Sequence, residues 1–125
     1  MNLKQIQIFT KYWIPVIAWG SLIFFLSSLS SLPTQTIDLP FLDKTGHLFE
    51  YFILGFLICR ALRNTQKKIT RKKTFFLTIL FCLLYGISDE VHQLFIPQRE
   101  FEFYDIIADV SGAILSQIIY GKHYE

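Results

Sequence analysis

The sequence predicts an all-α fold, an integral membrane bundle of four transmembrane helices. The 125-residue chain is 52% apolar and 17% aromatic, and its mean hydropathy is +0.39. Its apolar residues are grouped in long blocks rather than alternating with polar ones, which favours membrane-spanning helices over strands. A chain of this length allows one compact unit, so we expect a single transmembrane domain over residues 1–125.

The apolar blocks predict spans at about 12–28, 46–62, 74–95 and 105–120. The first block opens with Tyr12 and Trp13, which are aromatic residues typical of the membrane interface. A cleaved signal peptide is the alternative for this block, because Lys4 and Lys11 precede it. Nothing that follows resembles a secreted soluble domain, so we expect a retained span.

The second and fourth blocks would form helices only roughly 24–26 Å long, at about 1.5 Å per residue. A hydrocarbon core is about 30 Å thick. We therefore expect the polar ends of these two helices to lie at or inside the headgroup level. Pro97 is expected to stop the third helix, and Pro33 and Pro40 mark the first loop as irregular.

Charge sets the predicted orientation. The segment "RALRNTQKKITRKK", residues 60–73, carries many Lys and Arg and no acid, so it is expected on the cytoplasmic side together with the N-terminus. Both termini then lie inside, and the 27–45 and 96–104 loops lie outside. The basic segment is a topology signal or also a site for anionic lipid. Nucleic-acid binding is not expected, because these charges lie against the lipid bilayer.

Polar residues converge at the predicted outer ends of three spans. On the second span, Asp43, Lys44, His47, Glu50 and Tyr51 fall within an arc of about 120°. Carboxylates that face lipid cost several kcal/mol each, so we expect these faces to turn inward, towards one another. The expected product is a polar pocket that opens on the outer surface.

Two further helical faces complete this pocket. Around the axis of the third helix, Gln93 falls at an angle between those of Asp89 and Glu90, so its amide could bridge both carboxylates. On the fourth span, one stripe holds Asp105, Asp109, Gly112 and Ser116. The alternative is that polar residues at helix ends simply lie in the headgroup layer. Similar faces on three helices favour a shared pocket. The less central candidates are Glu50 and His92, and we expect Cys59 and Cys82 to be packing residues.

These segments resemble the VanZ-like family of small bacterial membrane proteins. The matching segments are "LSSLSSLP", "DKTGHLFEYFILG" with the pattern D-K-x-x-H-x-x-x-Y, "YGISDEVHQLFIPQRE" with D-E-x-x-Q-x-x-x-P-x-R, and "DIIADVSGAIL", which is similar to D-x-x-A-[ND]-x-x-G-A. The resemblance covers roughly residues 12–120. Two positions depart from it: Gln98 stands where many relatives have Gly, and Asp109 stands where Asn is frequent.

The resemblance implies a shared polar set and a link to the cell envelope. The family is named for a protein associated with resistance to the glycopeptide teicoplanin, and glycopeptides act outside the cytoplasmic membrane. A multi-pass protein of the bacterial cell membrane is therefore expected. The implied polar set is Asp43, Lys44, His47, Tyr51, Asp89, Glu90, Gln93, Arg99, Asp105 and Asp109.

Binding of a lipid headgroup, a cell-wall precursor or an amphiphilic antibiotic is the first functional hypothesis. Arg99 and Lys44 would hold a phosphate or carboxylate, and Tyr51 could donate a hydrogen bond. If the pocket catalyses a reaction on such a ligand, His47 is the natural general acid or base, positioned by Asp43 or Glu90. The candidate catalytic residues are His47, Glu90 and Asp89; the candidate binding residues are Asp43, Lys44, Tyr51, Gln93, Arg99, Asp105 and Asp109.

Two alternatives remain open. No cofactor motif is present, but His47 with Asp89, Glu90, Asp105 and Asp109 would suit Mg²⁺ or Mn²⁺ better than Zn²⁺. A small proton-coupled transporter is also conceivable, since intramembrane carboxylates often mark ion paths. Against transport, we expect the inner halves of the spans to offer only Ser116, Thr78 and the cysteines as polar groups.

Overall fold

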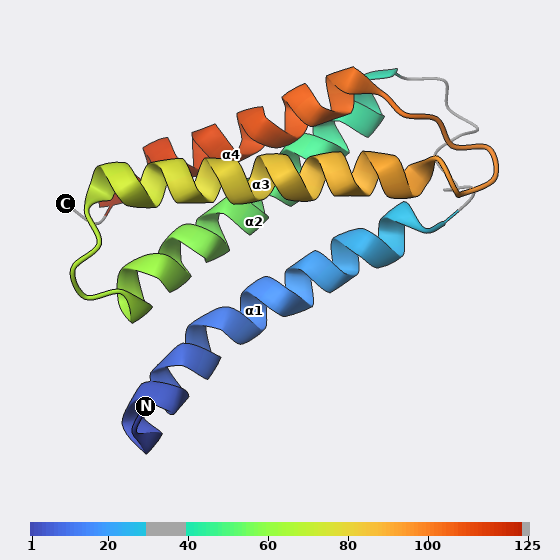
Figure 1. Cartoon of the computed structure of the whole chain (residues 1–125). Helices are drawn as coiled ribbons and strands as arrows, with labels where there is room; N and C mark the ends of the chain where they lie inside the picture. Colours follow the sequence, from blue (N-terminus) through green and yellow to red (C-terminus); the bar gives the residue numbers. More distant parts are fainter. Residues whose placement is uncertain (30–39, 124–125) are drawn as a thin grey trace.

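Four long helices form the architecture of the computed structural model, which describes residues 1–29 and 40–123 (Figure 1). The all-α prediction is confirmed, because no strand occurs within these described ranges. Each helix is long and apolar enough to cross a membrane. The bounds are α1 Leu3–Ser27, α2 Pro40–Thr65, α3 Arg71–Gln93 and α4 Phe103–His123.

The helices run alternately up and down along one common direction (Figure 1). The start of α1, the α2–α3 link and the end of α4 lie at one end of the molecule, which we call the basic end because it carries the 60–73 segment. The end of α1, the start of α2 and the α3–α4 link lie at the opposite end, which we call the polar end. Helix α4 packs mainly on α2, and α1 diverges from α3 towards its N-terminus. The direction of the bundle across the membrane stays a prediction.

Local sequence explains where two of the helices begin. At α1, the Asn2 side chain accepts a hydrogen bond from the backbone N–H of Gln5, and the Gln5 side chain accepts one from the backbone N–H of Asn2, each at 2.9 Å. This reciprocal pair is a capping box. At α3, the Thr70 hydroxyl accepts from the backbone N–H of Lys73 at 3.2 Å. Both caps satisfy N–H groups that have no partner within the helix.

The helices extend beyond the apolar blocks that predicted them. Helix α2 has 26 residues and α4 has 21, so at about 1.5 Å per residue they are roughly 39 Å and 32 Å long. The expectation that both would be shorter than the hydrocarbon core is therefore wrong. Their backbones continue through polar residues such as Asp43 and Asp105, whose side chains pair with Lys44. Helix α3 instead ends at Gln93, four residues before Pro97. Pro33 lies outside the described residues.

Small residues allow the helices to approach closely. The buried face of α3 carries Thr74, Thr78, Cys82 and Gly86 at four-residue intervals. Small side chains at this spacing are typical of helix–helix contacts within membranes. At Gly86, an added Cβ would lie 2.7 Å from the Asp109 carboxylate of α4. The sequence of α3 therefore favours a tight contact with α4 rather than a large apolar core.

Helices α2 and α4 meet at two glycines. A Cβ added to Gly112 would collide with the backbone carbonyl of Leu48. A Cβ added to Gly55 would lie 2.6 Å from the Ser116 hydroxyl and 3.0 Å from the Cα of Ala113. Since real Cβ atoms essentially never lie under 3.0 Å from such atoms, Gly112 needs glycine for this packing, whereas a side chain at Gly55 would require the Ser116 hydroxyl to move. This contact fixes the axial offset between α2 and α4.

Large apolar side chains lie mostly on the outside of the bundle. Phe25, Phe76, Phe81 and Leu84 are each more than half exposed, whereas the interior contains many buried polar groups. A water-soluble protein shows the opposite pattern. This arrangement suits helices whose outer surfaces contact hydrocarbon and whose polar groups are satisfied inside the protein.

Candidate functional site

Polar side chains from α2, α3 and α4 gather in the interior of the polar end. The most buried of them are Glu90 and Asp109, each 0% exposed, and Asp105, 2% exposed. His47 and Asp89 are also buried, at 7% and 5% exposed. The sequence places these groups by helical phase, since each one lies on the face that its helix turns towards the other helices. They form a cluster within the protein rather than a set of separate headgroup-layer residues.

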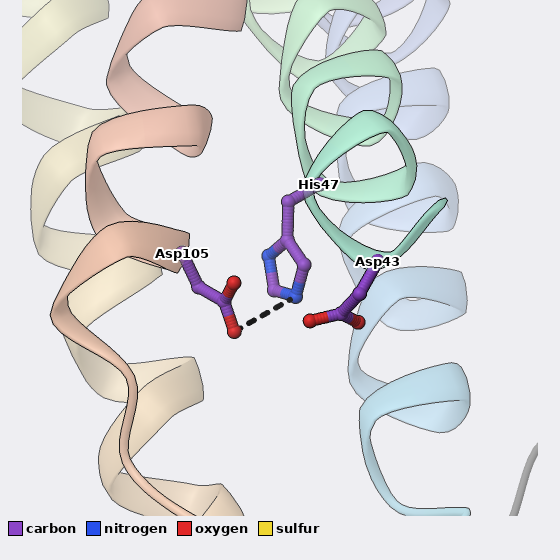
Figure 2. A group of neighbouring side chains, drawn as sticks. All are labelled: Asp43, His47 and Asp105. Atoms are coloured by element: carbon purple, nitrogen blue, oxygen red, sulfur yellow. Dashed lines mark ion pairs between the residues drawn. The ribbon is translucent and has the colours of Figure 1, made fainter. Parts of the chain in front are cut away.

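His47 lies between two carboxylates of α4. Its Nδ1 is 2.8 Å from Asp109 Oδ1, and its Nε2 is 3.6 Å from Asp105 Oδ2. Figure 2 shows the ring of His47 directed towards Asp105, with Asp43 on the other side of the same nitrogen. Because Asp105 and Asp109 are four residues apart, they lie one helical turn apart on one face of α4. The two acids therefore reach both nitrogens of one ring.

Lys44 is engaged by carboxylates. Its Nζ lies 3.4 Å from Asp43 Oδ2 and also contacts the side-chain oxygens of Glu102 and Asp105. Each contact is an ion pair, and the Asp105 carboxylate is almost fully buried. Lys44 was predicted to hold an anionic group of a ligand. In this structure its charge is already directed at three acids of the protein.

Glu90 and Gln93 occupy the α3 side of the cluster. Glu90 Oε2 accepts a hydrogen bond from the backbone N–H of Glu102 at 3.0 Å. Gln93 Nε2 donates to the Ser27 hydroxyl of α1 at 3.3 Å. The amide bridge that was expected between Asp89 and Glu90 is not found among the described hydrogen bonds. The hydroxyl of Ser27, at the end of α1, therefore belongs to this side of the cluster. The helical phase of the sequence could not predict this contact.

Tyr51 and Arg99 lie at two edges of the cluster. Tyr51 is 0% exposed, and its ring centroid is 6.3 Å from that of Tyr85. Arg99 is half-buried, and its Nε donates to the backbone carbonyl of Leu29 at 3.1 Å. Arg99 therefore ties the α3–α4 link to the end of α1. The roles in ligand binding that were predicted for these two residues stay predictions.

Several residues near the cluster were missed or ranked low by sequence analysis. Glu102 contacts Lys44, and its position three residues before Asp105 is the signal that could have found it. His92 lies 2.9 Å from the Ser28 hydroxyl and stacks on Phe24, with ring centroids 4.4 Å apart.

Towards the basic end, Thr74 and Gln117 are also buried polar groups, so the expectation that this half offers only Ser116, Thr78 and cysteines is wrong.

Two sets of side chains at this site could hold a metal ion. One is Asp43, His47 and Asp105, and the other is His47, Asp89 and Glu90; within each set the candidate ligand atoms all lie within 4.8 Å of one another. A histidine flanked by carboxylates is also a common acid–base arrangement. Around these groups the acids outnumber the bases.

The fold and the site together define a class of protein. Four membrane-capable helices enclose a histidine and several buried carboxylates, which is a multi-pass membrane protein with an embedded polar site. The chain matches the VanZ/LLP1 family over residues 2–121, and it belongs to this family. The family resemblance noted in the sequence is thereby confirmed.

The chain is also similar to a eukaryotic protein. It is 31% identical over 90 residues to the "Uncharacterized protein C11E3.10" of Schizosaccharomyces pombe. The aligned region covers 69% of this chain and 52% of the yeast protein, so the chain spans about half the length of that relative. No solved structure matches the chain. The bacterial membrane, the cell-envelope role and the link to antibiotic resistance stay predictions.

Proposed function

We propose that this protein binds the polar headgroup of a membrane amphiphile at its polar end, with the apolar chain of that ligand held in a neighbouring groove. One observation carries the proposal: an open apolar cavity of about 430 Å³ lies between α1, α2 and α3, helical turns away from the buried polar cluster. Its lining includes Gly20, Phe24, Leu54, Ile58 and Tyr85. Binding sites for small molecules commonly enclose 300–1,000 Å³, with apolar walls and a few polar groups.

The groove and the polar cluster lie on successive turns of α1 and α3. Tyr85 lines the groove and lies one helical turn before Asp89, about 6 Å along α3. Phe24 lines the groove from α1 and stacks on His92 at the polar end. The next turn of α1 brings Ser27 to Gln93. A ligand with one polar and one apolar part could therefore place its apolar part in the groove and direct its polar part towards the cluster.

The similarities favour a lipid headgroup over the other ligands that we considered. The VanZ-like family suggests an envelope ligand, and the predicted orientation turns the polar end outward. A wall precursor or a glycopeptide antibiotic would be a suitable ligand only for a bacterial protein. The relative in fission yeast favours a ligand that bacterial and eukaryotic membranes share, and lipid headgroups meet this condition.

Lipids that remain bound during purification test the proposal. We expect the chain purified in mild detergent to retain a defined lipid class, identified by mass spectrometry. Gly20→Leu should greatly reduce this retention, because it adds a side chain to the groove wall. Ala18→Leu is the matched control, since Ala18 lies on the same helix, is exposed and does not line the groove. Equal retention in both variants, or a bulk lipid mixture in the unmodified protein, would count against the proposal.

Catalysis on the same ligand is the second candidate function. It is favoured by the 2.8 Å contact between His47 Nδ1 and Asp109, which fixes the ring so that Nε2 could exchange a proton. If the protein is an enzyme, His47→Gln should retain the bound lipid class but stop its conversion in reconstituted vesicles. Unchanged conversion in His47→Gln would exclude His47 as the acid or base.

A further inference from the structure

We propose that His47, Asp89 and Glu90 bind one divalent cation within the buried cluster. The ligand atoms of these residues, from α2 and α3, all lie within 4.8 Å of one another. An ion between them would need only small side-chain movements to contact each one at the 2.0–2.6 Å typical of oxygen and nitrogen ligands. All three side chains are at least nine-tenths buried, so the site would exclude most competing water.

An oxygen without a partner points to a ligand at this place. Glu90 is 0% exposed, and although its Oε2 accepts a hydrogen bond from Glu102, its Oε1 has no hydrogen-bond partner. Asp109 Oδ2 is also buried and also has no hydrogen-bond partner. Leaving a buried carboxylate oxygen unsatisfied is costly, so such groups are usually paired or bound to metal. A cation beside Glu90 would remove this cost.

The orientation of His47 suits a metal ligand. Its Nδ1 is 2.8 Å from Asp109, so in the neutral ring the N–H at that position would donate to the carboxylate and Nε2 would keep a free lone pair. The carboxylates beside this nitrogen in Figure 2 are Asp105 and Asp43. One ring nitrogen of His47 also lies within 4.8 Å of ligand oxygens of Asp89 and Glu90. A histidine held by a carboxylate through one nitrogen while the other binds metal is a recurrent arrangement.

The balance of charge in the cluster favours a cation over an anionic group bound directly. Lys44 is paired with Asp43, Glu102 and Asp105, and Arg99 donates to a backbone carbonyl. The described acids that remain near His47 include Asp89 and Glu90. One added proton on His47 would neutralise a single charge, whereas a divalent cation would neutralise two.

The ligand types indicate a hard ion such as Mn²⁺ or Mg²⁺. Two carboxylates, with water to complete the coordination, are the ligands that these ions prefer. The alternative set of Asp43, His47 and Asp105 is a poorer site. Asp43 is exposed, and Asp105 is already paired with Lys44.

The role that we give to this cation rests on the proposed function. A cation held by His47, Asp89 and Glu90 would keep water ligands on its open side, and an anionic headgroup could replace them. Mg²⁺ is commonly bound in this way, by one or two carboxylates of the protein together with a phosphate of the substrate. Cation binding itself requires no lipid, so it can be tested separately.

Titration with Mn²⁺ tests the site. The full chain is purified in detergent, treated with chelator and titrated while electron paramagnetic resonance reports free Mn²⁺. We expect saturable binding of about one ion per chain, and a loss of affinity of at least about tenfold in Glu90→Gln, as for other altered metal sites. Glu100→Gln is the matched control; it removes an exposed acid of the α3–α4 link and should bind Mn²⁺ normally.

Further outcomes decide between the possibilities. If Glu90→Gln lacks the helical circular dichroism of the unmodified chain, Asp89→Asn replaces it in the same titration. No saturable binding in the unmodified chain, or an equal loss in Glu100→Gln, would overturn the proposal. A loss in Asp43→Asn without a loss in Glu90→Gln would also overturn it, in favour of the other set. Normal Mn²⁺ binding by a protein that retains no defined lipid would overturn the proposed function alone.

Discussion

His47 shows how one residue can depend on several helices. Its ring lies on α2, both of its nitrogens face acids of α4, and the neighbouring Glu90 belongs to α3. Removing one partner of a buried polar pair leaves the other unsatisfied, which commonly costs about 1–3 kcal/mol. We therefore expect the stability of the site to depend on the hydrogen-bonding capacity of each residue more than on its charge.

Asp109 allows charge and hydrogen bonding to be separated. We expect Asp109→Asn to fold with nearly unchanged stability, because the amide oxygen can still accept the hydrogen bond from His47 Nδ1. Asp109→Ala removes the acceptor and should lower the free energy of unfolding by about 1–3 kcal/mol. Thermal unfolding in detergent measures both variants. Equal destabilisation by Asn and Ala would show that the charge itself is required.

The backbone conformation at Gln98 explains why glycine would suit this position. It has φ of 66°, a left-handed conformation that side chains disfavour and that glycine adopts freely. The resemblance suggested that many relatives have Gly at this position. We expect Gln98→Gly to raise the stability by up to about 1 kcal/mol.

Glu100→Gly is the control for Gln98→Gly. Glu100 lies in the same link, and the only described non-glycine residue with positive φ is Gln98. The control should gain nothing, because glycine there only increases the freedom of the unfolded chain. A higher unfolding temperature for Glu100→Gly than for Gln98→Gly would contradict this explanation.

At the scale of helices, the contact between α2 and α4 places the site. Gly112 lies against the backbone of Leu48. Leu48 directly follows His47 in α2, and Gly112 is three residues after Asp109 in α4. Any increase in the separation of the two helices at this point would therefore also separate His47 from its acids. The glycine and the acid–histidine pair depend on the same close approach.

Gly112→Ala should thus destabilise the bundle. The added methyl group would collide with backbone atoms that cannot rotate away, and overpacking of this kind typically costs about 1–3 kcal/mol. Gly46→Ala is a matched control on α2, because a Cβ there meets nothing within 4 Å. Thermal unfolding should show a clear loss for the first variant and none for the second. Equal unfolding temperatures would argue against tight packing at Gly112.

At the scale of the whole molecule, the two ends differ in charge. The basic end carries the 60–73 segment, and there Arg60 lies over the Tyr12 ring at 4.9 Å from its centroid. The polar end carries the buried acids. Basic segments remain on the cytoplasmic side of membranes, and aromatic residues concentrate at the interface. This difference supports the predicted inward position of both termini.

Labelling of introduced cysteines tests this orientation. We expect Phe101→Cys, in the α3–α4 link, to react with a membrane-impermeant maleimide added to intact cells. Gln66→Cys, in the α2–α3 link, should react only after the membrane is opened. Cys59 and Cys82 are buried, so the unmodified chain gives the background. The reverse pattern would invert the topology and place the proposed ligand site on the cytoplasmic side.

Much of this arrangement could be predicted from the sequence. Hydropathy is a local property, so apolar blocks identified four helices without any tertiary information. Helical periodicity is also local, and it correctly turned Asp89, Glu90, Asp105 and Asp109 inward. Helix length was less predictable, because polar residues that find partners inside the protein can extend a helix beyond its apolar block.

The tertiary structure alone decided which groups meet. Phase gives the direction in which a side chain points, but it does not give the axial offset between helices. The close α2–α4 contact at Gly112 sets that offset, and it pairs His47 with Asp109 rather than with the Asp43 or Glu90 that we expected to position it. The end of α1 similarly directs Gln93 to Ser27. The sequence by itself determined that a buried acidic site forms at one end of four helices, whereas the partners within it follow from packing between helices.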